Sequence, residues 1–244
     1  LHGTIQFVGM SVYKEEAAAG VPMEGVYIPL SVVPEGADDA TAQRTNPLTL
    51  LEHGARHVIL GDPGSGKSTL LRFLALAGLH PRLQERYGAS PDSRLPVLIR
   101  FRRYAEALRE RPDLSLLDHA AEALREELGL PEVTRELLEY YLAAGEAVLL
   151  FDGVDELPGT EARVLVRDRI AELLEEFPGN TAIVSSRIIG YDKEARLDHL
   201  GFSHRQVARL TPEDIRRFVE DWYATRIENQ AERRRHAEDL LEVL

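Results

Sequence analysis

The sequence predicts an α/β protein with a mainly parallel β-sheet and helices on both of its faces. Three observations lead to this prediction. Short apolar segments alternate with longer segments of helical periodicity. The short segments are wholly or largely apolar, as strands covered on both faces require. The first of them leads directly into a glycine-rich loop, and an apolar helical segment follows that loop.

Five segments are expected to form the strands of this sheet, and they lie near 57–60, 97–101, 147–152, 181–186 and 206–210. Helices are expected between them, near 69–79, 115–128, 132–144 and 161–177. A further helix begins at Thr211-Pro212-Glu213, because threonine is a good N-cap, proline suits the first turn and an acid favours the positive helix end.

The composition narrows the class of protein. The chain has 244 residues and no cysteine, which excludes disulfides, thiolate chemistry and cysteine metal sites. The net charge of −12 argues against broad nucleic-acid binding, which needs a basic surface. The absence of cysteine also fits a cytoplasmic protein, which we expect. No apolar run approaches the ~18 residues of a membrane span, so no membrane span is expected. Because the chain begins with Leu1, we expect a fragment of a larger protein.

The glycine-rich loop matches the phosphate-binding pattern G-x-x-x-x-G-K-[ST] in full. Its residues are Gly61, Asp62, Pro63, Gly64, Ser65, Gly66, Lys67, Ser68 and Thr69. The glycines let successive backbone N–H groups curl around a phosphate, and the following helix directs its positive end at the same anion. Lys67 would bind the β- and γ-phosphates, and Ser68 would offer its hydroxyl to Mg²⁺. The sequence therefore predicts a P-loop that binds a nucleotide.

An acidic residue follows the third predicted strand. Asp152 comes directly after four apolar residues, at the carboxyl end of the strand, where α/β sheets bind their ligands. A P-loop ATPase needs such a carboxylate near its magnesium ion. Many of these enzymes place a catalytic glutamate next, but Gly153 stands at that position, and Asp155 and Glu156 follow later.

Together, GDPGSGKST and LLFDGVDEL resemble the NACHT domains of the STAND class of signal-transducing P-loop NTPases. The segments LPVLIR (95–100) and LTPEDI (210–215) are similar to the same family, and the resemblance covers about 57–225. It implies the strand order 5-1-4-3-2 and a bacterial source. It also implies three regions: an N-terminal extension packing on the core (1–56), the nucleotide-binding domain (57–211) and the start of a truncated small helical domain (212–244).

The resemblance also implies the roles of four site residues. Asp152 would be a Mg²⁺ ligand, directly or through water, and Asp155 would orient or deprotonate the attacking water, with Glu156 as the alternative. Arg187, at the tip of the fourth strand, would sense the γ-phosphate. The strand ends in SSR, and no N/T-K-x-D tetrapeptide that could recognise guanine occurs, which favours ATP and ADP over guanine nucleotides.

The resemblance implies a slow, Mg²⁺-dependent ATPase that acts as an ATP/ADP switch. It would control oligomerisation and effector activation, in immune or cell-death signalling. Its partners would be the nucleotide, its own downstream helical, winged-helix and sensor domains, and further copies of itself when activated. Two alternatives remain open: an AAA+-like ATPase motor, which Gly153 disfavours, and a nucleotide-stabilised module with negligible turnover.

Overall fold

A computed structural model of the chain describes residues 4–5, 21–22, 27–28, 30–39, 41–89, 93–128, 131–189, 191 and 196–243. The chain forms two compact units. One consists of Ser31–Ala208, and the other of Leu1–Leu30 together with Arg209–Leu244. Within the described ranges, no helix has both the length and the apolar character that a membrane crossing requires.

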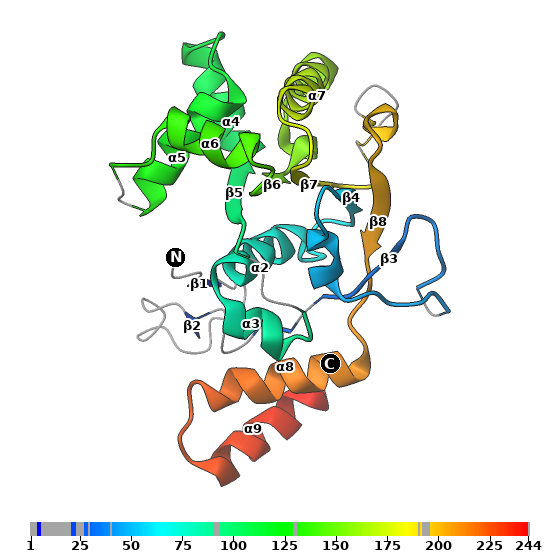
Figure 1. The fold of residues 1–244 in the computed structure, drawn as a ribbon. Coiled ribbons are helices and arrows are strands. Elements are labelled where there is room, and N and C mark those ends of the chain that lie inside the picture. The colour runs from blue at the N-terminus through cyan, green and yellow to red at the C-terminus, as the bar shows by residue number, and fades with distance from the viewer. Residues whose placement is uncertain are drawn as a thin grey trace. The chain divides into compact units, whose positions relative to one another are not determined.

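The unit formed by Ser31–Ala208 is built on a mixed sheet of six strands in the order β3-β8-β4-β7-β6-β5 (Figure 1). The strands are β3 (Val32–Pro34), β4 (Arg56–Leu60), β5 (Leu95–Arg100), β6 (Ala147–Asp152), β7 (Thr181–Ser186) and β8 (Ser203–Val207). The predicted count of five strands was wrong, because β3 adds a sixth strand, and so the order of the whole sheet differs from 5-1-4-3-2. The five parallel strands follow one another as β8-β4-β7-β6-β5, and β3 pairs with β8 in the antiparallel sense.

The two differences from the predicted sheet have physical reasons. Strand β3 has three residues, too few to show a strand pattern, and Pro34 is tolerated because it lies at the edge of the sheet. Strand β8 covers Ser203–Val207 rather than 206–210. Most of its residues are polar and partly exposed, so they lack the apolar run by which the other strands are recognised.

Helices cover both faces of this sheet (Figure 1). They are α2 (Lys67–Leu79), α3 (Pro81–Arg86), α4 (Phe101–Glu110), α5 (Leu116–Leu128), α6 (Arg135–Ala143) and α7 (Gly159–Glu176), with short 3₁₀ turns η1 (Pro47–Leu51), η2 (Val154–Glu156) and η3 (Asp198–Leu200). Successive strand residues point to opposite faces. On β6, Leu149 and Phe151 join the large cluster that includes α4–α7, whereas Leu150 points to the other face, where α2 lies.

The face of the sheet to which a strand-end residue points determines whether that residue lies near the phosphate loop. By the same alternation, Asp152 shares the face of Leu150 on β6. On β7, Ala182 and Val184 belong to the α4–α7 cluster. Ser185 therefore lies on the α2 face, and Ser186 on the opposite one.

The other unit contains a two-stranded antiparallel pair, β1 (Thr4–Ile5) and β2 (Val21–Pro22), and the helices α8 (Pro212–Ala224) and α9 (Gln230–Leu241). The predicted start of α8 is confirmed. Thr211 caps the helix by accepting a hydrogen bond from the backbone N–H of Asp214, whose carboxylate accepts one from the N–H of Thr211 in return. Helix α8 packs on α9. The division into regions 1–56, 57–211 and 212–244 stays a prediction.

Candidate nucleotide site

The loop between β4 and α2 has the backbone of a phosphate-binding loop. Gly64 and Gly66 have φ angles of +81° and +91°, which residues with a side chain adopt only at a cost in free energy. At Gly61 the reason for glycine is space, because an added Cβ would lie 2.4 Å from the Oγ of Ser65. The loop thus closes tightly on itself, and α2 begins directly after it, at Lys67, with its N-terminus toward the loop.

Lys67 lies across this loop. Its Nζ donates hydrogen bonds to the backbone oxygens of Gly61 at 2.7 Å and Asp62 at 3.0 Å. Burial lowers the pKa of Lys67, and the negative charge of Asp155 is the largest opposing effect. The ammonium group is therefore held by neutral carbonyls in a partly desolvated place, where an anionic phosphate would be a stronger partner.

The hydroxyl of Ser68 connects the loop to the end of β6. Its Oγ lies 3.0 Å from Oδ1 of Asp152 and donates a hydrogen bond to it. The same carboxylate oxygen accepts a second hydrogen bond, 2.7 Å long, from Oγ of Ser185 on β7. Oxygen ligands of this kind are those that Mg²⁺ prefers, and an ion held by one carboxylate, a hydroxyl and phosphate oxygens needs no larger protein cluster. The side chains of Ser68 and Asp152 therefore fit the predicted ion. Among the described residues there is no group of three or more acidic or histidine side chains that could hold a metal ion.

Asp155 and Arg187 form an ion pair beside this carboxylate. Nε of Arg187 lies 2.8 Å from Oδ2 of Asp155, and the backbone N–H of Arg187 donates to Oδ1 at 2.9 Å. The side chain of Asp155 is only 7% exposed, whereas that of Arg187 is 50% exposed. Both oxygens of Asp155 are thus bonded to one residue, and the guanidinium of that residue still reaches solvent.

Gly153 and Glu156 form the turn that follows β6. Gly153 has a φ of +83°, and a Cβ on it would lie 3.1 Å from Cγ and Cδ of Glu156. Burial raises the pKa of Glu156, and the charges of Asp152 and Asp155 raise it further. The turn therefore needs glycine for its backbone angle and brings three carboxyl groups close together.

The structure brings the predicted residues to one pocket of about 290 Å³ at the carboxyl ends of β4, β6 and β7. Its lining residues are Pro63, Gly64, Gly66, Lys67, Ser68, Thr69, Asp152, Gly153, Asp155, Glu156, Ser185 and Arg187. The remaining predicted loop residues, Gly61, Asp62 and Ser65, belong to the loop but do not line the pocket. Sequence reasoning missed Ser185 as a site residue. The sequence feature that could have indicated it is a hydroxyl residue at the end of an apolar strand, two positions before Arg187.

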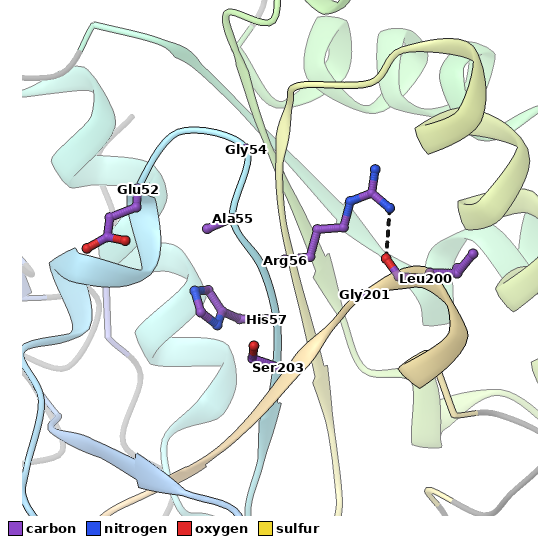
Figure 2. A pocket seen from close by; sticks show the side chains of 8 residues that line it. All are labelled: Glu52, Gly54, Ala55, Arg56, His57, Leu200, Gly201 and Ser203. Atoms are coloured by element: carbon purple, nitrogen blue, oxygen red, sulfur yellow. Dashed lines mark hydrogen bonds between the residues drawn. The ribbon is translucent and has the colours of Figure 1, made fainter.

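A larger hollow of about 540 Å³ lies where β4 and β8 begin, lined by Glu52, Gly54, Ala55, Arg56, His57, Leu200, Gly201 and Ser203 (Figure 2). The guanidinium of Arg56 donates to the backbone oxygen of Leu200 at 2.8 Å, and burial lowers the pKa of His57. The hollow is wide open and contains no residue of the phosphate loop. Its size alone does not make it the site, because ligands of parallel α/β sheets bind at the carboxyl ends of the strands.

Comparison with known proteins gives the family. The NACHT domain family matches residues 55–226, which is most of the chain, and no curated protein matches. The chain therefore belongs to the NACHT family of P-loop NTPases, as the sequence predicted.

Proposed function

We propose that the chain is a slow, Mg²⁺-dependent ATPase that works as an ATP/ADP switch and controls oligomerisation and the activation of an effector. The observation that supports this most strongly is the pocket shared by the phosphate loop, Asp152, Asp155 and Arg187. Only a ligand that carries phosphates and a divalent cation would use all of these groups together.

Binding of the nucleotide would use the loop and Lys67. The backbone N–H groups around Gly64 and Gly66, together with the N-terminus of α2, would surround the phosphate oxygens. Lys67 would exchange its bonds to the carbonyls of Gly61 and Asp62 for the β- and γ-phosphates. Ser68 and Asp152 would hold Mg²⁺, whose charge neutralises the charge that develops on the phosphates.

We attribute the slow hydrolysis to the two bonds between Asp155 and Arg187. A carboxylate that orients or deprotonates water must have an oxygen within hydrogen-bond reach of that water. Both oxygens of Asp155 are bonded to Arg187, so one bond must lengthen or break before Asp155 can act. Glu156 is the alternative base. Its raised pKa keeps it closer to the pH at which a base is effective.

The same ion pair supports a switch. A γ-phosphate would compete with Asp155 for the guanidinium of Arg187, and ADP would not. ATP and ADP would then favour different positions of Arg187 and of the segment that follows it. A switch needs such a difference, because a ligand shifts an equilibrium only by its differential affinity for the two states.

In the complete protein, we propose that the downstream helical, winged-helix and sensor domains change their arrangement in response to the position of Arg187 and of the segment that follows it. ATP would favour an open form that assembles into a homo-oligomer, in immune or cell-death signalling in the cytoplasm. The pairing of Asp155 with Arg187 also favours a second candidate, a module in which bound ADP is structural and turnover is negligible.

The experiment that tests the proposal is to denature the purified protein and identify the released nucleotide by ion-exchange chromatography. Adenine nucleotide is expected, and release of GDP would contradict the assignment of the base. Multi-angle light scattering of the complete protein with ATP or with ADP then tests the switch. Oligomers should form with ATP only, whereas equal masses with both nucleotides would favour the structural module.

A further inference from the structure

Ser185 has an unusual place for a hydroxyl group. It is the fifth residue of β7, only 1% exposed, and its strand runs between β4, which leads to the phosphate loop, and β6, which ends in Asp152. A buried hydroxyl must find hydrogen-bond partners inside the protein, so the identity of those partners indicates what it does.

Its two partners belong to Asp152, a residue of the predicted magnesium site, and to Gly153, which follows it. Oγ of Ser185 accepts a hydrogen bond of 2.9 Å from the backbone N–H of Gly153. It donates its single proton to Oδ1 of Asp152 at 2.7 Å. The two bonds fit together, because a hydroxyl that accepts from an N–H keeps its own proton for the carboxylate.

The carboxylate is thereby fixed from two sides. Oδ1 of Asp152 accepts hydrogen bonds from Ser68 on α2 and from Ser185 on β7. Among the described residues, Oδ2 has no hydrogen-bond partner. The two hydroxyls thus determine the rotation of the carboxylate and leave its other oxygen available, in a residue that lines the pocket. Removing a group that orients a metal ligand in this way typically lowers metal affinity by about 10- to 100-fold.

We infer that Ser185 is a positioning residue, which orients Asp152 toward the divalent cation of the bound nucleotide. The inference rests on the proposed function, since it needs a chain that binds a nucleotide together with Mg²⁺. In this role Ser185 acts through Asp152 and not as a ligand of the ion. Its effect should therefore appear in the contribution of Mg²⁺ to binding, and not in the binding of the phosphates to the loop.

The neighbouring residue supplies a matched control. Ser186 is equally buried, but it lies on the opposite face of the sheet. Within the part of the chain that the structure describes, its hydroxyl bonds only to the backbone oxygen of Arg187, at 3.2 Å. The Ser185→Ala and Ser186→Ala substitutions each remove one buried hydroxyl from the same strand. Only the first removes a bond to Asp152.

The experiment is a fluorescence titration of each protein with an ATP analogue, once with excess Mg²⁺ and once with EDTA. The readout is the ratio of the two dissociation constants. Mg²⁺ should strengthen binding of the analogue to Ser185→Ala by a factor about 10-fold or more smaller than for the unchanged protein, which is the range for groups that orient a metal ligand. Affinity in EDTA should stay near that of the unchanged protein, and Ser186→Ala should keep the full ratio.

Different results contradict different claims. If the unchanged protein binds the analogue equally well in Mg²⁺ and EDTA, the proposed magnesium site is wrong. If the unchanged protein depends on Mg²⁺ and Ser185→Ala depends on it equally, only the role of Ser185 is wrong. Where Ser185→Ala does not fold, Ser185→Thr and Ser185→Val replace it, since they have the same shape and only threonine has the hydroxyl. Threonine should keep the Mg²⁺ dependence and valine should lose it, and equal behaviour of the two would overturn the inference.

Discussion

Replacing Gly153 by alanine tests whether the turn after β6 requires glycine, as its geometry indicates. The φ angle of +83° lies in the left-handed region, where a side chain costs roughly 1–2 kcal/mol. The new Cβ would also lie 3.1 Å from Cγ and Cδ of Glu156. Displacing that side chain from its rotamer adds about 0.5–1.5 kcal/mol. Gly153→Ala should therefore lower the free energy of unfolding by about 1.5–3.5 kcal/mol.

A second glycine separates the two contributions. Gly36 has a φ of +74° and nothing within 4 Å of a Cβ built on it, so Gly36→Ala should show the backbone cost alone. The free energies of unfolding would be measured by urea denaturation at equilibrium. In a background of Glu156→Ala, the cost of Gly153→Ala should fall to that of Gly36→Ala. A loss below about 0.5 kcal/mol for Gly153→Ala, the size of an ordinary surface substitution, would show that the turn does not require glycine.

Three further substitutions test the site and its support. Asp155→Asn should lower steady-state ATP hydrolysis by about 10²-fold, the lower end for losing a general base, and change the dissociation constant of ATP much less. An equal effect on both would contradict a role in activating water. Glu156→Gln tests the raised pKa of Glu156. The folded state holds that proton more tightly, so the unchanged protein loses stability as pH rises from the ordinary glutamate pKa of 4.5 through the raised pKa of the folded state. The glutamine variant should therefore be the more stable protein in thermal unfolding at neutral pH, and a difference that did not shrink toward acidic pH would count against this. Asn180→Ala removes a buried side chain that bonds three backbone groups, at 2.8, 3.0 and 3.0 Å. It should destabilise the protein by about 3 kcal/mol in urea denaturation, and a loss near zero would show that water replaces those bonds.

The parallel part of the sheet could be predicted because its strands are buried on both faces. The segments that became β4, β5, β6 and β7 are apolar for that reason, and a wholly apolar run is visible in a sequence. Strand β8 is largely polar, so a strand was expected there but its bounds were misplaced at 206–210. The edge strand β3 could not be predicted in the same way. It has only three residues, so its pairing with β8 depends on contacts between distant parts of the chain.

The phosphate loop was predictable because its chemistry depends on residue types at fixed spacing, from Gly61 to Ser68. The contacts of Ser185 were not predictable, since they require the register between β6 and β7, in which Phe151 pairs with Val184. The ion pair between Asp155 and Arg187 was missed for the same reason. The sequence placed both residues at strand ends but could not show that they bond each other.

The central claim is that this chain binds ATP through the phosphate loop, with Lys67 as the main cation. Isothermal titration with Mg²⁺-ATP and Mg²⁺-GTP tests it most directly, on the unchanged protein and on Lys67→Ala. Arg72→Ala is the matched control, because Arg72 is an exposed cation further along α2. The unchanged protein and Arg72→Ala should bind ATP in preference to GTP, and Lys67→Ala should show no measurable binding. Unchanged affinity for ATP in Lys67→Ala would contradict the claim.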